Sequence, residues 1–149
     1  MQYRHRGWLT LEKVDPPVRI VQGRYIPQAN PFLDFTGAWT ERGGRSLHVE
    51  AKDVDTDSLK VDGSPGIGAS QRENILRWCI AKATVFVLWH RRGEVMLLTP
   101  EIIQRAVIER KAGERRARAV HWSEGIPVPR GIGYVTHDFR AIMCDLWTG

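Results

Sequence analysis

Two carboxylates and a lysine lie close together between residues 34 and 52, and their types and spacing suit phosphodiester hydrolysis. Asp34 lies in the apolar stretch FLDFTG, and Glu50 and Lys52 lie in HVEAK, at the end of a second apolar stretch. Alternate residues of a strand share a face, so Glu50 and Lys52 are expected to point the same way while Val49 and Ala51 point the other. Hydrolysis needs an activated water and a partner for the developing negative charge, and a divalent cation beside a lysine can supply both.

These residues therefore predict a magnesium site with a catalytic lysine. Asp34 and Glu50 are expected to hold Mg²⁺, or Mn²⁺ in its place, and the carbonyl of Ala51 is expected to add an oxygen ligand. Lys52 is expected to orient the attacking water or to stabilise the developing charge. Asp53 follows directly, but strand alternation turns it away from Glu50 and Lys52. The same pattern also occurs on ordinary strand surfaces, so the neighbouring elements have to distinguish a site from a surface.

The segments that carry these residues predict a β-hairpin followed by a helix. Residues 32–39 and 46–52 are apolar stretches joined by the polar, glycine-containing TERGGR, and residues 7–14 alternate as an edge strand does. Ser70, with Glu73 three residues later, predicts a capping box at the start of a helix that has an apolar stripe behind it. The hairpin is expected to place the two carboxylates on neighbouring strands.

The second half of the chain predicts further strands and a second helix. Residues 83–90 form a continuous β-branched and aromatic run, which is typical of a strand buried on both faces, and residues 94–99 follow after the turn RRG. Thr99 and Pro100 predict the N-cap and the first residue of the second helix. Together the elements predict an α/β fold in which one domain, residues 1–149, has a mixed central sheet flanked by helices.

The charge of the chain favours an acidic partner. The chain has 149 residues, of which 42% are hydrophobic, and a formal net charge of +5. Nucleic acid is the commonest acidic partner of a basic protein, and the segment RAVIERKAGERRAR gathers basic residues that include Arg115, Arg116 and Arg118. These three arginines are expected to contact DNA phosphates. A solvated helix face paired with Glu109 and Glu114 is the alternative.

Other classes of function are not supported by the sequence. No apolar run approaches the roughly 20 residues that a membrane span needs, and the N-terminus lacks the apolar stretch of a signal peptide, which favours a cytoplasmic protein. GSPGIG follows a polar loop and lacks the lysine and hydroxyl residue of a phosphate-binding loop, so no nucleotide cofactor is expected. Cys79 and Cys144 lack the spacing of a zinc site and are expected to be reduced and inert.

Four segments of the chain follow one another in an order that is similar to that of a known protein family. PFLDFTGAW comes first, followed by GRSLHVEAK, by the glycine-containing loop, and by SQRENILRWCIAKATVFVLWH. In this order they resemble the core motifs of the RecU-type Holliday junction resolvases, within the PD-(D/E)xK nuclease superfamily. The resemblance covers roughly residues 7–104 and recurs more loosely in RGIGYVTHDFRAIMCDLW.

The resemblance implies a restriction-endonuclease-like fold and a magnesium-dependent, homodimeric endonuclease that resolves four-way (Holliday) junctions in branched DNA. Asp34 and Glu50 match the family's metal-binding carboxylates, Lys52 matches its catalytic lysine, and Gln71 matches a glutamine on the next helix that supports the site. Thr36 lies where the family has a hydroxyl beside the aspartate. Plain alternatives are a polar residue in the first helical turn for Gln71 and an ordinary strand residue for Thr36.

Two features depart from the family's pattern. The family's first helix carries a further glutamate near the metal. Glu12 does not match this glutamate, because Glu12 lies in a predicted strand. The site then works with fewer carboxylates, uses another glutamate, or is completed by the partner subunit. Residues 20–31 take the place of the family's stalk, and the bracketing prolines predict a short, stiff projection that offers Arg24 and Tyr25 to DNA. A restriction-like or repair endonuclease and a non-catalytic DNA-binding module are the alternative functions.

Overall fold

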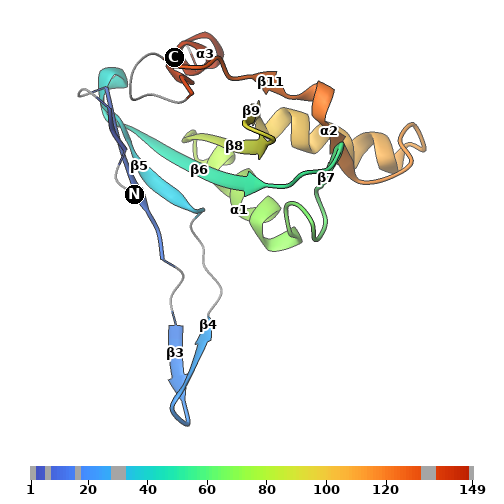
Figure 1. Ribbon diagram of the computed structural model, residues 1–149, viewed down its shortest axis with the longest axis horizontal. Coiled ribbons are helices and arrows are strands. Elements are labelled where there is room, and N and C mark those ends of the chain that lie inside the picture. The colour runs from blue at the N-terminus through green and yellow to red at the C-terminus, as the bar shows by residue number, and fades with distance from the viewer. Residues whose placement is uncertain (1–2, 6–7, 16–17, 28–32, 132–136, 148–149) are drawn as a thin grey trace.

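The structure is a computed structural model that describes residues 3–5, 8–15, 18–27, 33–131 and 137–147 of the chain. A curved sheet forms its centre, with two helices on one side, a third helix on the other, and a hairpin that projects from the body (Figure 1). In this described part, none of the helices has the length and apolarity that a membrane crossing requires.

Seven strands form the main sheet, in the spatial order β1-β2-β5-β6-β8-β9-β11. Their bounds are Tyr3–His5 (β1), Leu9–Lys13 (β2), Phe35–Trp39 (β5), Arg45–Asp53 (β6), Thr84–Arg91 (β8), Glu94–Leu98 (β9) and Ile126–Pro127 (β11). Neighbours are antiparallel except for β6 and β8, which are parallel. The predicted α/β fold with a mixed central sheet and flanking helices is thereby confirmed.

The other elements attach to this sheet. Two short antiparallel ribbons pair β3 (Val18–Val21) with β4 (Arg24–Pro27) and β7 (Ser58–Lys60) with β10 (Ala119–His121). The helices of the described residues are α1 (Ala69–Ile80), α2 (Pro100–Lys111) and α3 (Arg140–Leu146), and two 3₁₀ turns cover Thr40–Arg42 and Trp122–Glu124. Because β7 and α1 connect β6 to β8, these two strands can lie parallel, as a tight turn would not allow.

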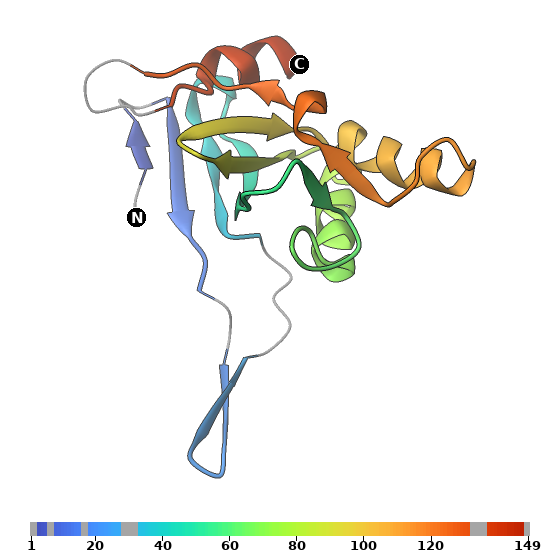
Figure 2. The same ribbon diagram turned by 45° about the vertical axis from the view of Figure 1, so that its right-hand side comes forward.

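Buried side chains cover both faces of the central strands. On one face, Val87 of β8 belongs to a cluster that includes Ile75 of α1 and Ile103 of α2. On the other face, Phe86 of β8 belongs to a cluster that includes Met143 of α3. Figure 2 shows α3 across the sheet from α1 and α2. Burial on both faces explains the continuous apolar run of residues 83–90.

The two long helices start differently from one another. Thr99 caps α2 as predicted, since its hydroxyl accepts the N–H of Ile102 over 3.3 Å. The predicted capping box at Ser70 is wrong, because the N-cap of α1 is the extended Gly68, two residues earlier, and Ser70 already lies within the helix. The side chain of Gln71, in the third helical position, instead accepts the N–H of Gly68 over 3.0 Å. The position of Gln71 in the first turn is what brings its amide to the site described below.

The hairpin β3–β4 projects away from the body in both views (Figures 1 and 2). Gln22 and Gly23 form its turn with φ of 50° and 74°, the left-handed backbone that a two-residue hairpin turn requires. Arg24 and Tyr25 follow the turn and are exposed, Tyr25 by 73%. The projection expected over residues 20–31 falls partly on this hairpin, and its residues 28–31 lie outside the described part of the chain.

Candidate active site

Asp34 lies directly before β5, beside Glu50 of β6. The antiparallel register sets Phe35, the first residue of β5, opposite Val49, so Asp34 before it comes level with Glu50. Asp34 donates its backbone N–H to Oε2 of Glu50 over 3.2 Å, and its own Oδ2 accepts the N–H of Ala51 over 3.0 Å. These reciprocal hydrogen bonds hold both carboxylates next to each other.

Lys52 and Gln71 complete the set from the helix side of the sheet. Nζ of Lys52 lies 3.1 Å from Oε1 of Glu50, as expected for alternate residues of one strand. The side-chain amide of Gln71 donates to Oε1 of Glu50 over 2.7 Å, and its oxygen accepts from Nζ of Lys52 over 3.0 Å. A reversed amide would set a donor against the ammonium and an oxygen against the carboxylate, so the charges on both sides fix its orientation.

The site concentrates negative charge in a buried position. Glu50 is 2% exposed. Burial first, and then the charge of Asp34, raise the pKa of the Glu50 carboxyl above its usual value, whereas Lys52 acts in the opposite direction. One ammonium therefore faces two carboxylates. A further positive charge beside the carboxylates is electrostatically favourable.

The oxygen atoms of the site fit a magnesium-type cation. A carboxylate has about four lone-pair positions. Oε1 of Glu50 accepts two hydrogen bonds, from Gln71 and Lys52, whereas Oε2 accepts one, from Asp34. Oδ1 of Asp34 accepts none from the described residues. The remaining lone pairs therefore lie on Asp34 and on the Oε2 side of Glu50, and hard oxygen donors of this kind suit Mg²⁺.

Protein ligands are few at this position. The described residues contain no group of three or more His, Cys, Asp or Glu side chains that could hold a metal ion. Asp34 and Glu50 supply two carboxylates, and the carbonyl of Ala51 is the further oxygen ligand that the sequence suggested. Mg²⁺ usually keeps several waters and often binds proteins through only one or two carboxylates, so this donor set fits it.

A buried histidine supports β6 next to the site. His48 lies two residues before Glu50 on the same face, is 2% exposed, and stacks on Trp78 of α1 with 3.7 Å between ring centroids. Its Nδ1 lies 3.1 Å from Oγ1 of Thr36 and its Nε2 lies 2.7 Å from Oγ of Ser46. Burial lowers the pKa of His48 to about 4, so the ring is neutral at pH 7.

This histidine cluster changes the interpretation of Thr36. Its hydroxyl bonds to His48, and no hydrogen bond of the structure joins it to Asp34. The local sequence pattern does not predict this cluster, because the cluster depends on the pairing of β5 with β6 and on the packing of α1. The alternation of Ser46, His48 and Glu50 along one strand was the available signal.

Asp53 lies outside the site, in agreement with strand alternation. Its carboxylate is exposed and lies 3.2 Å from Nδ1 of His90, on the other face of β6.

Cys79 and Cys144 are free cysteines.

The three arginines of the basic segment have different surroundings. Arg115 is 17% exposed, and its guanidinium lies 2.6 Å from both Glu109 and Glu124. These hydrogen bonds raise the pKa of Arg115 above its usual range. Arg116 and Arg118 instead line a surface pocket and form none of the ion pairs found among the described residues.

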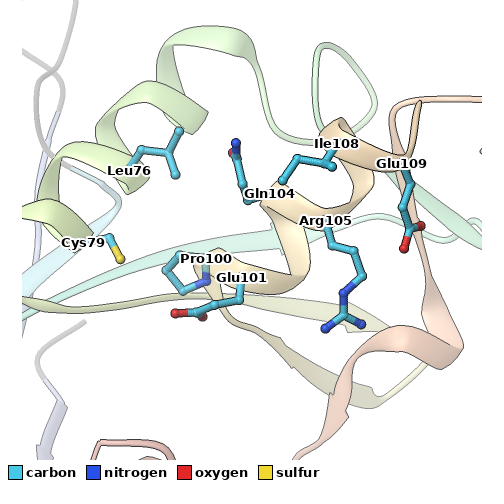
Figure 3. A pocket seen from close by; sticks show the side chains of 8 residues that line it. All are labelled: Leu76, Cys79, Pro100, Glu101, Gln104, Arg105, Ile108 and Glu109. Atoms are coloured by element: carbon cyan, nitrogen blue, oxygen red, sulfur yellow. The ribbon is translucent and has the colours of Figure 1, made fainter. Parts of the chain in front are cut away.

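A second hollow lies between the two long helices. Figure 3 shows Leu76 and Cys79 of α1 facing Gln104 and Ile108 of α2 across it. Its lining contains neither the carboxylates nor the lysine of the site. This hollow is therefore separate from the candidate active site.

Comparisons with known proteins give no family assignment. The chain matches no protein-family model, and no curated protein matches it significantly.

Proposed function

We propose that the protein is a magnesium-dependent endonuclease that cuts branched DNA, with the four-way (Holliday) junction as its preferred substrate. The observation that carries this proposal is the closed set of hydrogen bonds among Asp34, Glu50, Lys52 and Gln71. It joins two carboxylates, one ammonium and the side-chain amide that orients them, at one end of the paired strands β5 and β6. This combination of groups can hold a divalent cation and stabilise the negative charge that develops in phosphodiester hydrolysis.

The chain's own residues have separate roles in hydrolysis. When bound at Asp34, Glu50 and the Ala51 carbonyl, Mg²⁺ supplies positive charge at the phosphate and makes a water easier to deprotonate. Lys52 stabilises the charge that develops on the attacked phosphate and orients the water. The water oxygen forms a new P–O bond, one bridging P–O bond breaks, and a proton passes to the leaving oxygen. Gln71 is a positioning residue, since it holds both Glu50 and Lys52.

Branched DNA is supported by the projecting hairpin and by the resemblance to RecU-type resolvases. An exposed Arg24 and Tyr25 at the tip of a hairpin offer a charge for phosphate and a ring for an unpaired base. A four-way junction has an open centre that can admit such a projection. It also has two equivalent strands to cut, which a homodimer with two-fold symmetry matches. We place this activity in the cytoplasm.

The basic segment contributes DNA contacts in this proposal, but not all of its arginines do so equally. Arg116 and Arg118 are free to bind phosphate. Arg115 is engaged by Glu109 and Glu124, and its role is to hold the segment in place. The negative partners of Arg115 also neutralise most of the charge that it could offer to DNA.

Incubation of the purified protein with labelled DNA in Mg²⁺ tests this function. The substrates are a four-way junction and a linear duplex that contains one of its arms, and EDTA provides the control without metal. The proposal predicts paired cuts in the junction, slow or no cutting of the duplex, and no cutting in EDTA. Equal cutting of both substrates would indicate a restriction-like or repair nuclease. Binding without cutting in Mg²⁺ or Mn²⁺ would indicate a non-catalytic DNA-binding module.

A further inference from the structure

Five basic side chains line a pocket at the far end of α2 from its N-cap. The pocket has a volume of about 480 Å³. Its charged lining residues are Lys60, Asp62, Arg110, Lys111, Arg116 and Arg118. We call it the basic pocket. It brings together β7, the last turn of α2 and the segment that leads into β10, so the chain contributes to it from three places.

Among the described residues, a single acidic side chain, Asp62, lines the basic pocket beside its five cations. In the part of the chain that the structure describes, none of these five side chains forms an ion pair within 4.0 Å. Neighbouring Arg115 shows the contrast, since two glutamates hold its guanidinium. Five positive charges against the single Asp62 leave a local charge of +4, because 5 − 1 = 4. Like charges gathered in this way repel one another unless an anion joins them.

The helix terminus alone does not account for this cluster. Basic residues are common in the last turn of a helix, where they interact favourably with the helix dipole, and this explains Arg110 and Lys111. Lys60, Arg116 and Arg118 come from outside the helix and have no such reason to converge there. The helix dipole therefore does not explain why these three side chains gather beside Arg110 and Lys111.

Two hydrogen bonds of Val61 connect the basic pocket to the start of α1, next to Gln71 of the candidate active site. The N–H of Val61 donates to the carbonyl of Arg118 over 2.9 Å. The carbonyl of Val61 accepts a hydrogen bond from the guanidinium of Arg72, the residue that follows Gln71 on α1. One framework therefore runs from the basic pocket through Val61 to the first turn of α1. The basic pocket and the first turn of α1, which carries Gln71, are thereby joined through Val61.

We infer that the basic pocket binds a backbone phosphate of the DNA, at a different position from the phosphate that is cut. This inference rests on the proposed nuclease function. Arginine is well suited to phosphate because its planar guanidinium offers paired donors, and two arginines of the basic pocket lie outside the helix. The pocket aligns the DNA on the protein, and the Val61 framework keeps that alignment relative to Glu50 and Lys52.

The salt dependence of duplex binding tests the inference. Arg116→Gln with Arg118→Gln removes two phosphate contacts, so the slope of log Kobs against log salt should fall by about 1.8 units. Measurement in EDTA keeps the DNA uncut. Arg42→Gln with Arg77→Gln is the matched control, since both arginines are exposed and lie outside the basic pocket and the basic segment. The control should change the slope by less than about half a unit.

Kinetics give a second prediction from the same variants. Phosphate binding away from the cut bond stabilises the bound substrate and the transition state alike, so the KM of the double variant should rise while its kcat stays the same. The inference would be overturned if the Arg116→Gln, Arg118→Gln variant had the same salt slope of DNA binding as the parent. It would also be overturned if the control variant lost as much of that slope.

Titration with pyrophosphate separates this inference from the nuclease function. We expect pyrophosphate to shift the backbone amide NMR signals of Ala117 and Arg118 in the parent protein but not in the double variant. If the parent binds no DNA but pyrophosphate still shifts these signals, the nuclease proposal fails and an anion pocket stands. If pyrophosphate leaves them unchanged and the double variant binds DNA as the parent does, the basic pocket has no role in binding phosphate.

Discussion

The amide nitrogen of Gln71 lies 2.7 Å from Oε1 of Glu50, although the two residues are 21 positions apart in the chain. The contact exists because α1 begins just after Gly68 and so brings its first turn over β6. The oxygen of the same side-chain amide accepts a hydrogen bond from Nζ of Lys52. The start of α1 therefore determines how the Glu50 carboxylate and the Lys52 ammonium are oriented. The geometry of the candidate site therefore depends on where one helix begins.

Replacing Gln71 with alanine should slow cleavage by about 10- to 100-fold, as is typical when a residue that orients catalytic ligands is lost. The loss should appear in kcat, with little change in KM, because Gln71 holds Glu50 and Lys52 and not the DNA. Single-turnover and steady-state cleavage of a labelled junction measure both. Glu73→Ala, on an exposed position of the same helix, is the control and should cleave at the parent rate. A Gln71→Ala variant as fast as the parent would exclude the positioning role.

Removing the polar tip of the β3–β4 hairpin should reduce junction selectivity. The double change Arg24→Ala and Tyr25→Ala removes one phosphate contact and one stacking ring, and junction affinity should fall by about tenfold or more. Affinity for a linear duplex should change by less than about twofold, since the duplex has no open centre for the hairpin. Gel-shift titrations of both DNAs measure the difference. Ile20→Thr changes an exposed residue of the same hairpin and is the control. Equal weakening for both DNAs would show that selectivity arises elsewhere.

Local sequence patterns were sufficient to predict part of this structure. Alternation along β6 placed Glu50 and Lys52 on one face and Asp53 on the other, because strand geometry is local. Thr99 and Pro100 marked the start of α2 for the same reason. The mixed sheet followed from the order of such elements.

Contacts between distant segments could not be predicted in the same way. The capping box at Ser70 fitted the local pattern, but the backbone of Gly68 and the side chain of Gln71 determine where α1 begins. Arg115 belongs to a run of basic residues, and its pairing with Glu124 depends on the turn between α2 and β10. The short strands β1, β7, β10 and β11 carry too few residues for a periodic pattern.

Gly37 should be essential for the packing of β2 against β5. A Cβ at this position would lie 1.8 Å from the carbonyl oxygen of Thr10, so Gly37→Ala requires the backbone of β2 to move. We expect the free energy of unfolding to fall by about 2 kcal/mol or more. Gly63→Ala is the control, because no atom lies within 4 Å of its added Cβ. Urea unfolding measures both variants, and an unchanged midpoint for Gly37→Ala would contradict the strand pairing.

The buried His48 should make stability depend on pH. Its pKa is about 4 when folded and about 6.5 when unfolded, so the unfolded chain binds more protons between these values. The stabilisation is complete above pH 6.5 and is lost as the pH falls towards 4. Between pH 7.5 and pH 5 the loss should be about 2 kcal/mol.

The variant His48→Gln isolates this effect. It removes the titrating ring, and its stability should fall less than that of the parent protein over the same pH range in urea unfolding. Identical pH dependence in the two proteins would mean that His48 does not titrate abnormally.

The cleavage rate of the Glu50→Gln variant tests the central claim most directly. Glutamine keeps the size of the side chain but removes the negative charge of the carboxylate that we propose as a metal ligand. Cleavage of a labelled four-way junction in Mg²⁺ should therefore slow by about 1,000-fold or more. Junction affinity should stay within about threefold, because most binding energy comes from phosphate contacts elsewhere. Asp53→Asn makes the same chemical change on the other face of β6 and should cut at the parent rate. Cleavage by Glu50→Gln within about tenfold of the parent rate would contradict a catalytic metal site built on Glu50.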